Sequence, residues 1–504
     1  MPERVRIELR PLGRVLAVAR GTPLRDLLWQ HGVEFPCGGL RNCGRCRVRL
    51  IEGEMPPRAG ESGVLTAAEL EAGWRLACRA QAEGDAVLEV EQLDAPILVD
   101  HTHFDFVPRS GYGVAVDLGT TTMAAQLLDL ATGHVLAVRT ARNPQGSMGA
   151  DIMSRLQFAR APAGREQLTT SVRSRIGRMI RGLLTAAGLR AAPLEAVVVV
   201  GNTAMHHLFC GLDTEPLARV PFQSPHDGLQ EFPAASLGWR IPGAAMVRFL
   251  PALGGFVGSD VLAGLLATRM HERPELAVLV DLGTNAEIVA GNSDGLLCTS
   301  AAAGPAFEGG RIAMGMQAGT GAICGVSIEG GELRCRVIGG GRPRGICGSG
   351  LVDAVAAALE LGWLAPNGRL AAGRPVLVLH DPVHLTQADV RELQLAKGAI
   401  AAGIRLLLGQ LGARPEQVAR VYVAGAFGNY VDQASARRIG LLDFPDTAIE
   451  PVGNSALLGA KIALFGTGPE ACEQRALRAK VRHVSLAELP GFQDAFIQAL
   501  EFPR

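Results

Sequence analysis

The sequence predicts two unlike folds in one chain of 504 residues: a small α+β domain at the N-terminus, then a larger α/β domain made of two similar halves. Three observations support this prediction. Four cysteines fall within a short N-terminal stretch of alternating, strand-like sequence. The tetrapeptide Asp-Leu-Gly-Thr occurs twice, 164 residues apart, each time after an apolar run typical of a buried strand. A glycine-containing loop follows another such run at residue 425.

Composition excludes several classes of function. Lysine and arginine together number 49, as do aspartate and glutamate, so net charge does not favour nucleic acid or an anionic membrane as a partner. The N-terminus is charged, and no apolar run approaches the ~20 residues of a membrane span. We therefore expect a soluble, cytoplasmic protein, in which disulfides are rare. Six of its ten cysteines are scattered, and we expect them to be buried as small hydrophobic residues.

The N-terminal segment, residues 1–91, alternates short strands with two helices. Thr22 is expected to cap the first helix, with Pro23 in its first turn and Gly32 at its end, and Thr66 is expected to cap the second. The strand-like segments are 4–10, 15–19 (joined to the first by a turn at 12–13), 46–53, 74–81 and 86–92. This order of elements is typical of a β-grasp domain.

The four N-terminal cysteines have the spacing Cys37-x5-Cys43-x2-Cys46-x31-Cys78. A tight loop that supplies three thiolates, with a distant fourth, is the pattern of a 2Fe-2S ferredoxin, whose plant-type form is C-x4-C-x2-C…C. The longer first gap resembles the adrenodoxin-like branch. A zinc site usually has two C-x2-4-C pairs, and only one pair occurs here, so zinc is the weaker alternative, beside incidental thiols.

Four arginines accompany the cysteines: Arg41, Arg45, Arg47 and Arg49. Positive charge near a cluster favours its reduced form. It could also guide the docking of an acidic partner. The alternative is a solvated strand face, because three of the four alternate along one strand. The sequence leaves these interpretations open.

Residues 92–111 show no periodicity and are interpreted as a linker, followed by lobes at 112–275 and 276–504. Each lobe begins with a strand that ends in Asp-Leu-Gly-Thr and returns as a second strand. An aspartate at a strand end can hold hydrated Mg²⁺, the glycine lets the backbone approach a phosphate, and threonine hydroxyls bind its oxygens. Two such hairpins can hold a triphosphate from both sides.

This arrangement resembles the two-lobed, duplicated, ribonuclease-H-like ATPase fold shared by actin, sugar kinases and heat-shock chaperones. The resemblance implies ATP and Mg²⁺ as cofactors. It assigns phosphate contacts to Asp117, Gly119, Thr120, Thr121 and Thr122 in the first hairpin, and to Asp281, Gly283, Thr284 and Asn285 in the second. It assigns the adenosine loop to Gly425, Ala426 and Gly428, and base contacts to Gln394 and Lys397 on a preceding helix. A solvated helix face is the alternative for Lys397.

Other motifs remain unassigned or are excluded. No Walker A loop and no dinucleotide-binding G-x-G-x-x-G unit occurs. His206 and His207 are interpreted as helix-start residues, not ligands. Residues 339–355 either help to bind nucleotide or form only a tight turn. Asp260 and Glu308 are acidic residues beside glycines, near the expected cleft.

The combination of a 2Fe-2S domain with this ATPase resembles the reductive activators of corrinoid proteins. Segments 143–156, 300–316 and 345–354 also resemble that family. The resemblance implies ATP-dependent one-electron reduction of Co(II) to Co(I), with the four cysteines carrying the electron. Asp117 and Asp281 would hold Mg²⁺ or orient the attacking water. The implied partners are a corrinoid protein of a methyltransferase system and an upstream electron donor, and a homodimer is possible.

Three alternatives come from other classes of protein. The first is a small-molecule kinase of the sugar-kinase kind that carries a structural cluster. The second is an ATP-binding redox sensor with negligible turnover. The third is the activator of a different low-potential enzyme, such as a radical dehydratase. Those activators hold a 4Fe-4S cluster between subunits with cysteines of the ATPase lobes, and the scattered cysteines here offer no clear counterpart.

Overall fold

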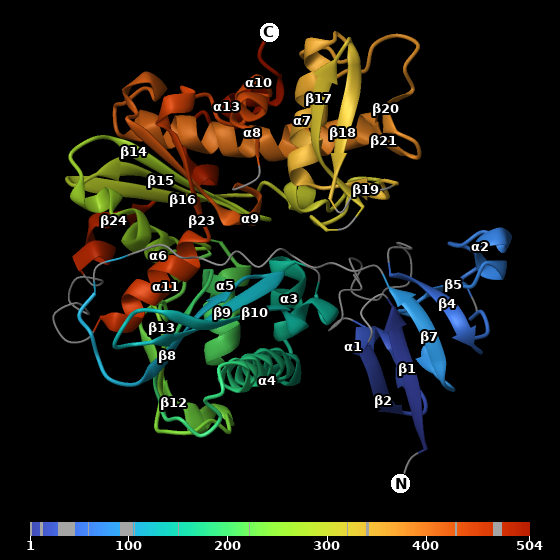
Figure 1. The fold of residues 1–504 in the computed structure, drawn as a ribbon. Helices are drawn as coiled ribbons and strands as arrows, with labels where there is room; N and C mark the ends of the chain where they lie inside the picture. The colour runs from blue at the N-terminus through green and yellow to red at the C-terminus, as the bar shows by residue number, and fades with distance from the viewer. Residues whose placement is uncertain are drawn as a thin grey trace.

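The computed structural model describes most of the chain (Figure 1). The described residues are 3–10, 14–28, 46–58, 60–90, 104, 106–149, 151–220, 222–319, 321–338, 342–428, 431–466 and 476–504. Hydrophobic side chains form one cluster in the N-terminal domain and three in the remainder of the chain. The N-terminal domain therefore has a core of its own.

The N-terminal domain is a five-stranded mixed sheet in the order β2-β1-β7-β4-β5. Strand β1 lies between β2 and β7, antiparallel to β2 and parallel to β7. Alternation along β1 buries Ile7 and Leu9, which pack with Leu24 and Leu28 of the helix α1. The strands are β1 (Arg4–Arg10), β2 (Arg14–Ala19), β4 (Arg47–Gly53), β5 (Trp74–Leu76) and β7 (Ala86–Val90). The topology confirms the predicted β-grasp.

The two helices of this domain test the predicted caps. Thr66 does cap α2 (Ala67–Glu71), because its hydroxyl accepts from the Glu69 backbone N–H while the Glu69 carboxylate accepts from the N–H of Thr66. The cap predicted at Thr22 is wrong. Thr22–Pro23 form the short strand β3, antiparallel to β6 (Gln81–Ala82), and α1 spans Leu24–Leu28. Pairing with β6 holds Thr22 and Pro23 in an extended conformation; the predicted helix end at Gly32 lies outside the described residues.

The first sheet has the order β10-β9-β8-β11-β13-β12. Its strands are β8 (Tyr112–Leu118), β9 (Thr122–Asp129), β10 (Val135–Arg142), β11 (Leu194–Val200), β12 (Gln230–Pro233) and β13 (Met246–Phe249). Its helices are α3 (Ile152–Ala159), α4 (Pro162–Ala186), α5 (Thr203–Cys210) and α6 (Ser259–Thr268). Short 3-10 turns are η2 (Pro144–Ser147), η3 (Glu215–Ala218), η4 (Ala234–Leu237) and η5 (Met270–Glu272).

The second sheet has the order β23-β22-β14-β15-β16-β24. Its strands are β14 (Ala277–Leu282), β15 (Ala286–Asn292), β16 (Gly295–Ala301), β22 (Arg420–Ala424), β23 (Ile449–Gly453) and β24 (Val481–His483). Its helices are α8 (Gln387–Gln410), α9 (Gly425–Gly428), α10 (Gln433–Arg438), α11 (Ser455–Phe465) and α13 (Phe492–Leu500). Its 3-10 turns are η6 (Pro305–Glu308), η7 (Pro415–Gln417), η8 (Asp446–Ala448) and η9 (Leu486–Glu488).

The two sheets repeat one topology. In each, three antiparallel strands (β8–β10 and β14–β16) are followed by a long helix (α4 and α8) and a strand parallel to the first (β11 and β22). A further parallel strand (β13 and β23) then leads into α6 and α11. The repeated tetrapeptide thus marks a duplicated structural unit.

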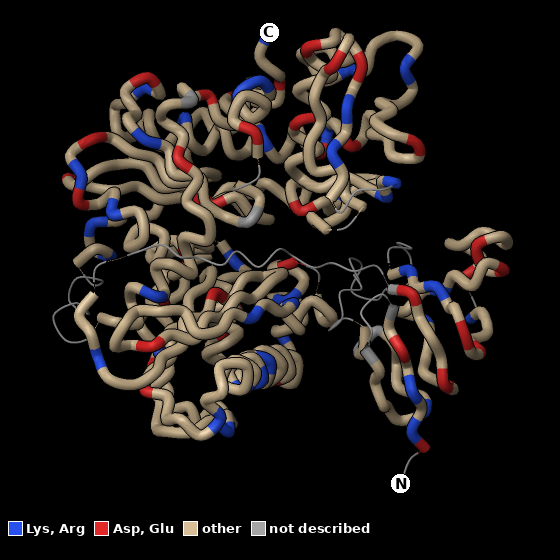
Figure 2. Tube along the Cα trace, in the orientation of Figure 1, with Lys and Arg blue, Asp and Glu red and all other residues tan. Residues whose placement is uncertain are grey.

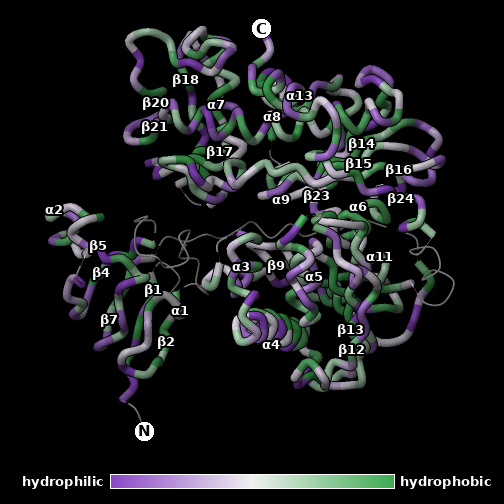
Figure 3. The backbone as a smooth tube through the Cα atoms, turned by 180° about the vertical axis from the view of Figure 1, so that it is seen from behind, coloured by the Kyte–Doolittle hydropathy of each residue, from purple (hydrophilic) through white to green (hydrophobic). Residues whose placement is uncertain are grey.

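Helices α6 and α11 lie between the two sheets in both views of the molecule (Figures 1 and 3). They share one hydrophobic cluster with strands of both sheets, including Ala115, Val198, Leu279 and Tyr422. Their backbones approach closely, since a Cβ on Gly459 of α11 would lie 1.9 Å from the Ala263 carbonyl oxygen of α6. Although α11 follows strand β23 of the second sheet, it also packs against the first sheet, so the two halves meet through buried helices.

The second half carries an insertion between β16 and α8. It consists of a three-stranded sheet, a hairpin and a helix. These are β17 (Ala322–Glu329), β18 (Glu332–Val337), β19 (Gly345–Ile346), β20 (Val376–His380), β21 (Val383–Thr386) and α7 (Gly348–Glu360). Helix α7 is buried over most of its length and joins the cluster of the second sheet.

Two general expectations can be compared with the described residues. Among the helices described, none is long and apolar enough to cross a bilayer. Basic and acidic residues are interspersed along the coloured parts of the chain (Figure 2).

The end of the predicted linker packs on the protein: the Phe106 ring lies 4.5 Å and the Phe104 ring 5.4 Å from Phe465 of α11, centroid to centroid.

Candidate functional site

Two of the four predicted cluster ligands are described, and the fold brings them together. Cys46 directly precedes β4 and Cys78 follows β5, while β4 and β5 pair antiparallel with Arg47 opposite Leu76. Both cysteines therefore lie at the same end of one strand pair, and the Ala77 N–H donates to the Cys46 carbonyl at 2.8 Å. Cys46 is buried and Cys78 half-buried. Cys37 and Cys43 lie outside the described residues.

The two described arginines beside the cysteines lie in ion pairs. Arg47 Nη1 is 2.5 Å from Glu69 and Arg49 Nη1 is 3.8 Å from Glu89. Local acidic partners thus offset part of the positive charge predicted there. Arg41 and Arg45 lie outside the described residues.

The scattered cysteines are mostly buried, as predicted. Cys210, Cys298 and Cys347 are buried, whereas Cys324 and Cys335 are half-buried, and Cys472 lies outside the described residues. Burial raises the pKa of the Cys298 thiol to about 12. A protonated thiol is a poor metal ligand, so this residue behaves as a small hydrophobic side chain.

The first hairpin predicted to bind phosphate, residues 117–122, joins β8 to β9 and accepts hydrogen bonds from asparagines. Gly119 fits a tight turn in which a Cβ would lie 2.4 Å from the Thr122 carbonyl oxygen. The Asn143 amide donates to the Gly119 carbonyl at 2.9 Å, and the Asn202 amide donates to Thr120 Oγ1 at 2.9 Å. These contacts fix the hairpin from two neighbouring loops.

Asn454 fixes the aspartate of the first hairpin. It is the N-cap of α11, where its Oδ1 accepts from the Leu457 N–H, and its Nδ2 donates to Asp117 Oδ2 at 2.8 Å. A helix that follows the second sheet therefore orients a carboxylate of the first sheet.

Glu308 joins the first phosphate hairpin to the second, residues 281–285. Thr284 Oγ1 donates to one carboxylate oxygen of Glu308 at 2.8 Å, and Thr121 Oγ1 donates to the other at 3.3 Å. Glu308 is the last residue of η6. The two hairpins predicted to face one another thus share a single carboxylate.

Four further carboxylates lie close enough for their charges to interact. Burial, with repulsion from Asp117, raises the pKa of Asp281 to about 7. Burial raises the pKa of Asp117 to about 6, against the hydrogen bond from Asn454. For Asp260, in the first turn of α6, burial and then the charges of Asp281 and Asp117 raise the pKa to about 8. For Glu287, opposite Asp281 in the sheet, burial and then the charges of Asp260 and Asp281 raise the pKa well above its ordinary value.

These four carboxylates suit a divalent cation that keeps several of its waters better than one enclosed by protein ligands alone. Within the described ranges, no three histidine, cysteine or acidic side chains are close enough to enclose a metal by themselves. Mg²⁺ is typically bound through one or two carboxylates, substrate phosphates and retained waters. Partly desolvated, mutually repelling carboxylates provide that chemistry, and a cation would relieve their repulsion.

The raised pKa values predict a pH-dependent response to Mg²⁺. Between about pH 4, the ordinary range for aspartate, and the raised pKa values of about 6–8, only the folded protein holds these protons. Metal-free stability should therefore fall as pH rises through this window, and Mg²⁺ should stabilise the protein more at pH 8 than at pH 5.5. Thermal unfolding at the two pH values measures this.

Asp260→Asn tests the origin of that response. It should raise the unfolding temperature of the metal-free protein at pH 8 and reduce the Mg²⁺ effect, because it removes one of the repelling charges. Asp443→Asn, at an exposed position, is the matched control. An equal Mg²⁺ effect at both pH values in the wild type would contradict the assignment.

The predicted adenosine loop follows β22 and forms the short helix α9. Gly425 has φ +91°, and a Cβ there would lie 2.7 Å from the Leu282 carbonyl and 2.8 Å from Asp281 Oδ1. A glycine is thus required for close packing on the second phosphate hairpin, in addition to any contact with adenosine. Phe427 of the loop stacks on Phe307 of η6 at 4.6 Å between centroids. Gly428 packs against Val423, and Ala426 lies between them in sequence.

Gln394 and Lys397 do not join this group. Both are almost fully buried on α8, and their polar atoms bind the C-terminal segment: Gln394 Nε2 donates to the Leu500 carbonyl at 2.8 Å, and Lys397 Nζ donates to that of Glu501. The solvated helix face considered for Lys397 is wrong, because the last residues of the chain cover it. We leave both residues out of the proposed nucleotide site.

Lys397→Met tests this placement. It should lower the thermal unfolding midpoint, because the part-buried hydrogen bond from the Lys397 ammonium to the Glu501 carbonyl is lost, and a bond from a charged donor contributes about 1.5–3 kcal/mol. Affinity for ATP should not change. Lys480→Met, at an exposed lysine, is the control. Loss of ATP affinity in Lys397→Met with unchanged stability would restore the base-contact assignment.

The histidines and the glycine-rich turn have local explanations. His206 and His207 are buried in α5, and their rings hydrogen-bond to the carbonyls of Gly228 at 3.1 Å and Asp213 at 2.6 Å. These hydrogen bonds agree with a structural role for both histidines.

In segment 339–355, Gly348 begins α7 and packs on the Phe307 carbonyl, while residues 339–341 lie outside the described residues.

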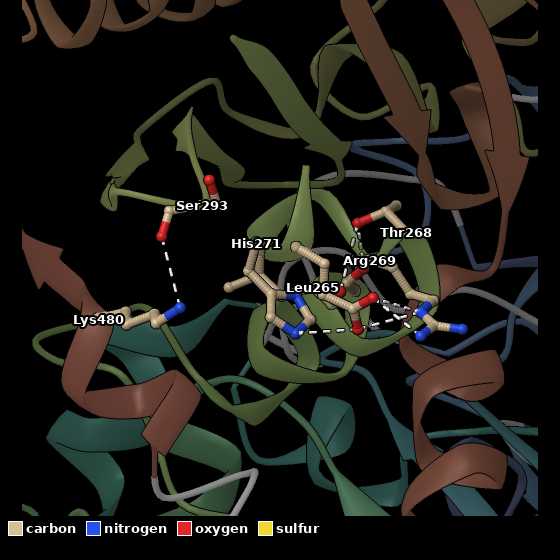
Figure 4. Close-up of polar contacts among 8 residues, drawn as sticks. Leu265, Thr268, Arg269, His271, Ser293 and Lys480 are labelled. Carbon is tan, nitrogen blue, oxygen red and sulfur yellow. Dashed lines mark hydrogen bonds and ion pairs between the residues drawn. The ribbon is translucent and has the colours of Figure 1, made fainter. Parts of the chain in front are cut away.

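A separate cavity of about 510 Å³ lies beside Arg269, the residue that follows α6 (Figure 4). It is lined by Arg269, His271, Glu272, Ser293, Ala476, Leu477 and Lys480. Arg269 Nε donates to both carboxylate oxygens of Glu272, at 3.0 and 2.9 Å. Nine residues of helix separate Arg269 from Asp260, roughly 14 Å along the axis. None of the predicted site residues lines this cavity.

The structure adds site residues that the sequence analysis did not assign. Asn143, Asn202 and Asn454 bind the first hairpin, and each is also the N-cap of a helix or 3-10 turn. An asparagine directly before a helix is visible in sequence, but its second contact is not. Glu308 and Asp260 were recognised only as acidic residues near glycines, and the structure places them with the hairpins.

The fold and the cysteine pair define a ferredoxin-type domain followed by a duplicated ATPase-type domain, and comparisons with known proteins agree. The model described as "C-terminal domain of RACo the ASKHA domain" matches residues 275–504, and that of the RACo middle region matches 112–273. A 2Fe-2S iron-sulfur cluster binding domain model matches residues 7–83.

Similar proteins extend this result over most of the chain. Corrinoid activation enzyme RamQ of Eubacterium limosum is 32% identical over 431 residues, 79% of this chain and 72% of RamQ. The [Co(II) methylated amine-specific corrinoid protein] reductase of Methanosarcina barkeri is 30% identical over 424 residues, 78% and 77% of the two chains. A solved structure titled "Reductive activator for corrinoid,iron-sulfur protein" aligns with 99% of this chain and 98% of its own, with 27% identity and a TM-score of 0.70. The chain belongs to the RACo family, which confirms the predicted resemblance.

Proposed function

We propose that this protein reactivates a corrinoid protein by ATP-dependent one-electron reduction of Co(II) to Co(I) through a 2Fe-2S cluster, in support of corrinoid-dependent methyl transfer. One observation carries the proposal: a cluster-type cysteine pair and a duplicated nucleotide cradle occur in one chain of this family. The names of the relatives supply the substrate class, a corrinoid protein.

The energetics explain why an electron carrier would need an ATPase. A plant-type 2Fe-2S ferredoxin has a potential of about −400 mV. Each 100 mV of deficit for one electron costs about 2.3 kcal/mol, and mass action compensates poorly for several times that. Nucleotide binding can supply the difference only if it favours one of two states of the protein. Two halves that meet at hairpins joined through Glu308 would allow nucleotide to favour one arrangement of the halves over another.

The roles of individual residues follow from the site. Cys37, Cys43, Cys46 and Cys78 would hold the cluster, which would supply one-electron transfer between an upstream donor and cobalt. Asp117 and Asp281 would hold hydrated Mg²⁺ or orient the attacking water, and the cation would neutralise phosphate charge. Thr120, Thr121, Thr122, Thr284 and the turn backbones at Gly119, Gly283 and Asn285 would bind phosphate oxygens. Gly425, Ala426 and Gly428 would contact adenosine.

ATP hydrolysis by the purified protein tests the proposal against its main alternatives. We expect the rate to rise when a Co(II) corrinoid protein of a methyltransferase system is added, and not with sugars or other small metabolites. Stimulation by a metabolite with formation of its phosphate ester would instead favour a kinase. Nucleotide binding without turnover under all conditions would favour a sensor.

A further inference from the structure

Glu308 occupies the hydroxyl groups that the proposed function assigns to phosphate. Its two carboxylate oxygens accept from Thr121 Oγ1 and Thr284 Oγ1, at 3.3 and 2.8 Å. Each hydroxyl has a single proton to donate. A phosphate oxygen at neutral pH is an acceptor and needs those same two protons. The carboxylate and a bound phosphate therefore cannot both be satisfied by these threonines.

The backbone around Glu308 is tightly packed, so its side chain is the part that can move. Gly309 ends η6 with φ +77°, and a Cβ there would lie 2.6 Å from the Met316 backbone. The preceding residue, Phe307, packs its carbonyl against Gly348 and stacks its ring on Phe427. Rotation of the Glu308 side chain alone would free both threonines.

The negative charges of Glu308 and of the phosphates also oppose one another. Glu308 lies at hairpins that also carry Asp117 and Asp281, whose pKa values are already raised by burial. A triphosphate adds further negative charge at the same hairpins. Like charges in a partly desolvated site repel strongly, so the carboxylate opposes the phosphate as well as occupying its donors.

We propose that Glu308 is an internal competitor of the nucleotide phosphates: its carboxylate binds the threonines of both hairpins, and a triphosphate must displace it to bind the same hydroxyl groups. The inference rests on the proposed nucleotide site and concerns its regulation. Glu308 is thus a positioning residue: it joins the two hairpins through their threonines, and a bound phosphate would break that connection. AMP, which lacks the β- and γ-phosphates, should not need to displace it.

The test is calorimetric titration of the full-length protein with a non-hydrolysable ATP analogue and, separately, with AMP, both in the presence of Mg²⁺. Glu308→Gln removes the charge and keeps an acceptor, and Glu308→Ala removes both. We expect each variant to bind the ATP analogue roughly tenfold more tightly than the wild type, since it removes a charged hydrogen-bond acceptor that competes for the threonines. AMP affinity should stay the same. Glu332→Gln, at an exposed position on β18, is the matched control.

The outcomes separate this inference from the function on which it rests. If the wild type binds the ATP analogue while both variants bind it equally or more weakly, Glu308 is not a competitor and the nucleotide site stands. Equal tightening for AMP and the ATP analogue would also overturn the inference, because the effect would not depend on the outer phosphates. If the wild type binds no nucleotide, the proposed function fails first.

Discussion

Replacing Cys78 with serine is expected to abolish electron transfer to cobalt while the nucleotide cradle stays folded. Cys78 follows β5 in the N-terminal domain, which has a hydrophobic core of its own. Loss of the 2Fe-2S group should therefore not unfold the second domain. Outer-shell partners of metal ligands alone contribute about 10–100-fold, so loss of a ligand should reduce the rate by on the order of 100-fold or more.

Iron content and visible absorption measure the loss of the 2Fe-2S cluster, and anaerobic formation of Co(I) measures the loss of electron transfer to cobalt. Cys324→Ser is the matched control, since this half-buried thiol donates to the Arg336 carbonyl, far along the chain from the predicted cluster ligands. ATP affinity should be unchanged in both variants. Normal Co(I) formation by Cys78→Ser would refute the ligand assignment.

Asp281→Asn is expected to reduce ATP hydrolysis and ATP-dependent Co(I) formation by about 100–1,000-fold, the range for removal of one group that stabilises transition-state charge. Asp281 is the penultimate residue of β14, packs against Gly425 and is repelled by the charge of Asp117. The substitution should also raise metal-free stability at pH 8, because a buried, repelling carboxylate is lost.

A fall in activity together with a rise in metal-free stability distinguishes a site residue from a structural one. Steady-state phosphate release and thermal unfolding are measured on the same preparations, with Asp443→Asn as control. The cluster absorption should match that of the wild type. A variant that loses stability together with activity would show that Asp281 supports the fold.

The elements with local patterns could be predicted from sequence. Alternation along β1 and β4 identifies a half-buried sheet, and the Thr66 capping box is complete within four residues. The repeated Asp-Leu-Gly-Thr predicts the duplication, because each copy ends a buried strand in the same position of its sheet. These features depend on neighbours in the chain.

The remaining features depend on tertiary contacts between distant segments. Asn454 reaches Asp117 across 337 positions, and Glu308 reaches Thr121 across 187. Gln394 and Lys397 have a spacing that suits an exposed helix face, but the last residues of the chain cover them. Thr22 has good capping chemistry, and pairing with β6 overrides it.

The most direct test of the account is an anaerobic reaction between the purified protein, a chemical reductant for its cluster and a Co(II) corrinoid methyl carrier. Appearance of Co(I) is followed by absorbance with MgATP, without nucleotide and with the non-hydrolysable analogue. The account predicts Co(I) only when both an intact cluster and MgATP are present, and none with Cys78→Ser. Co(I) formation at the same rate without nucleotide, or no Co(I) from several carriers while the cluster is reduced and reoxidised normally, would contradict it.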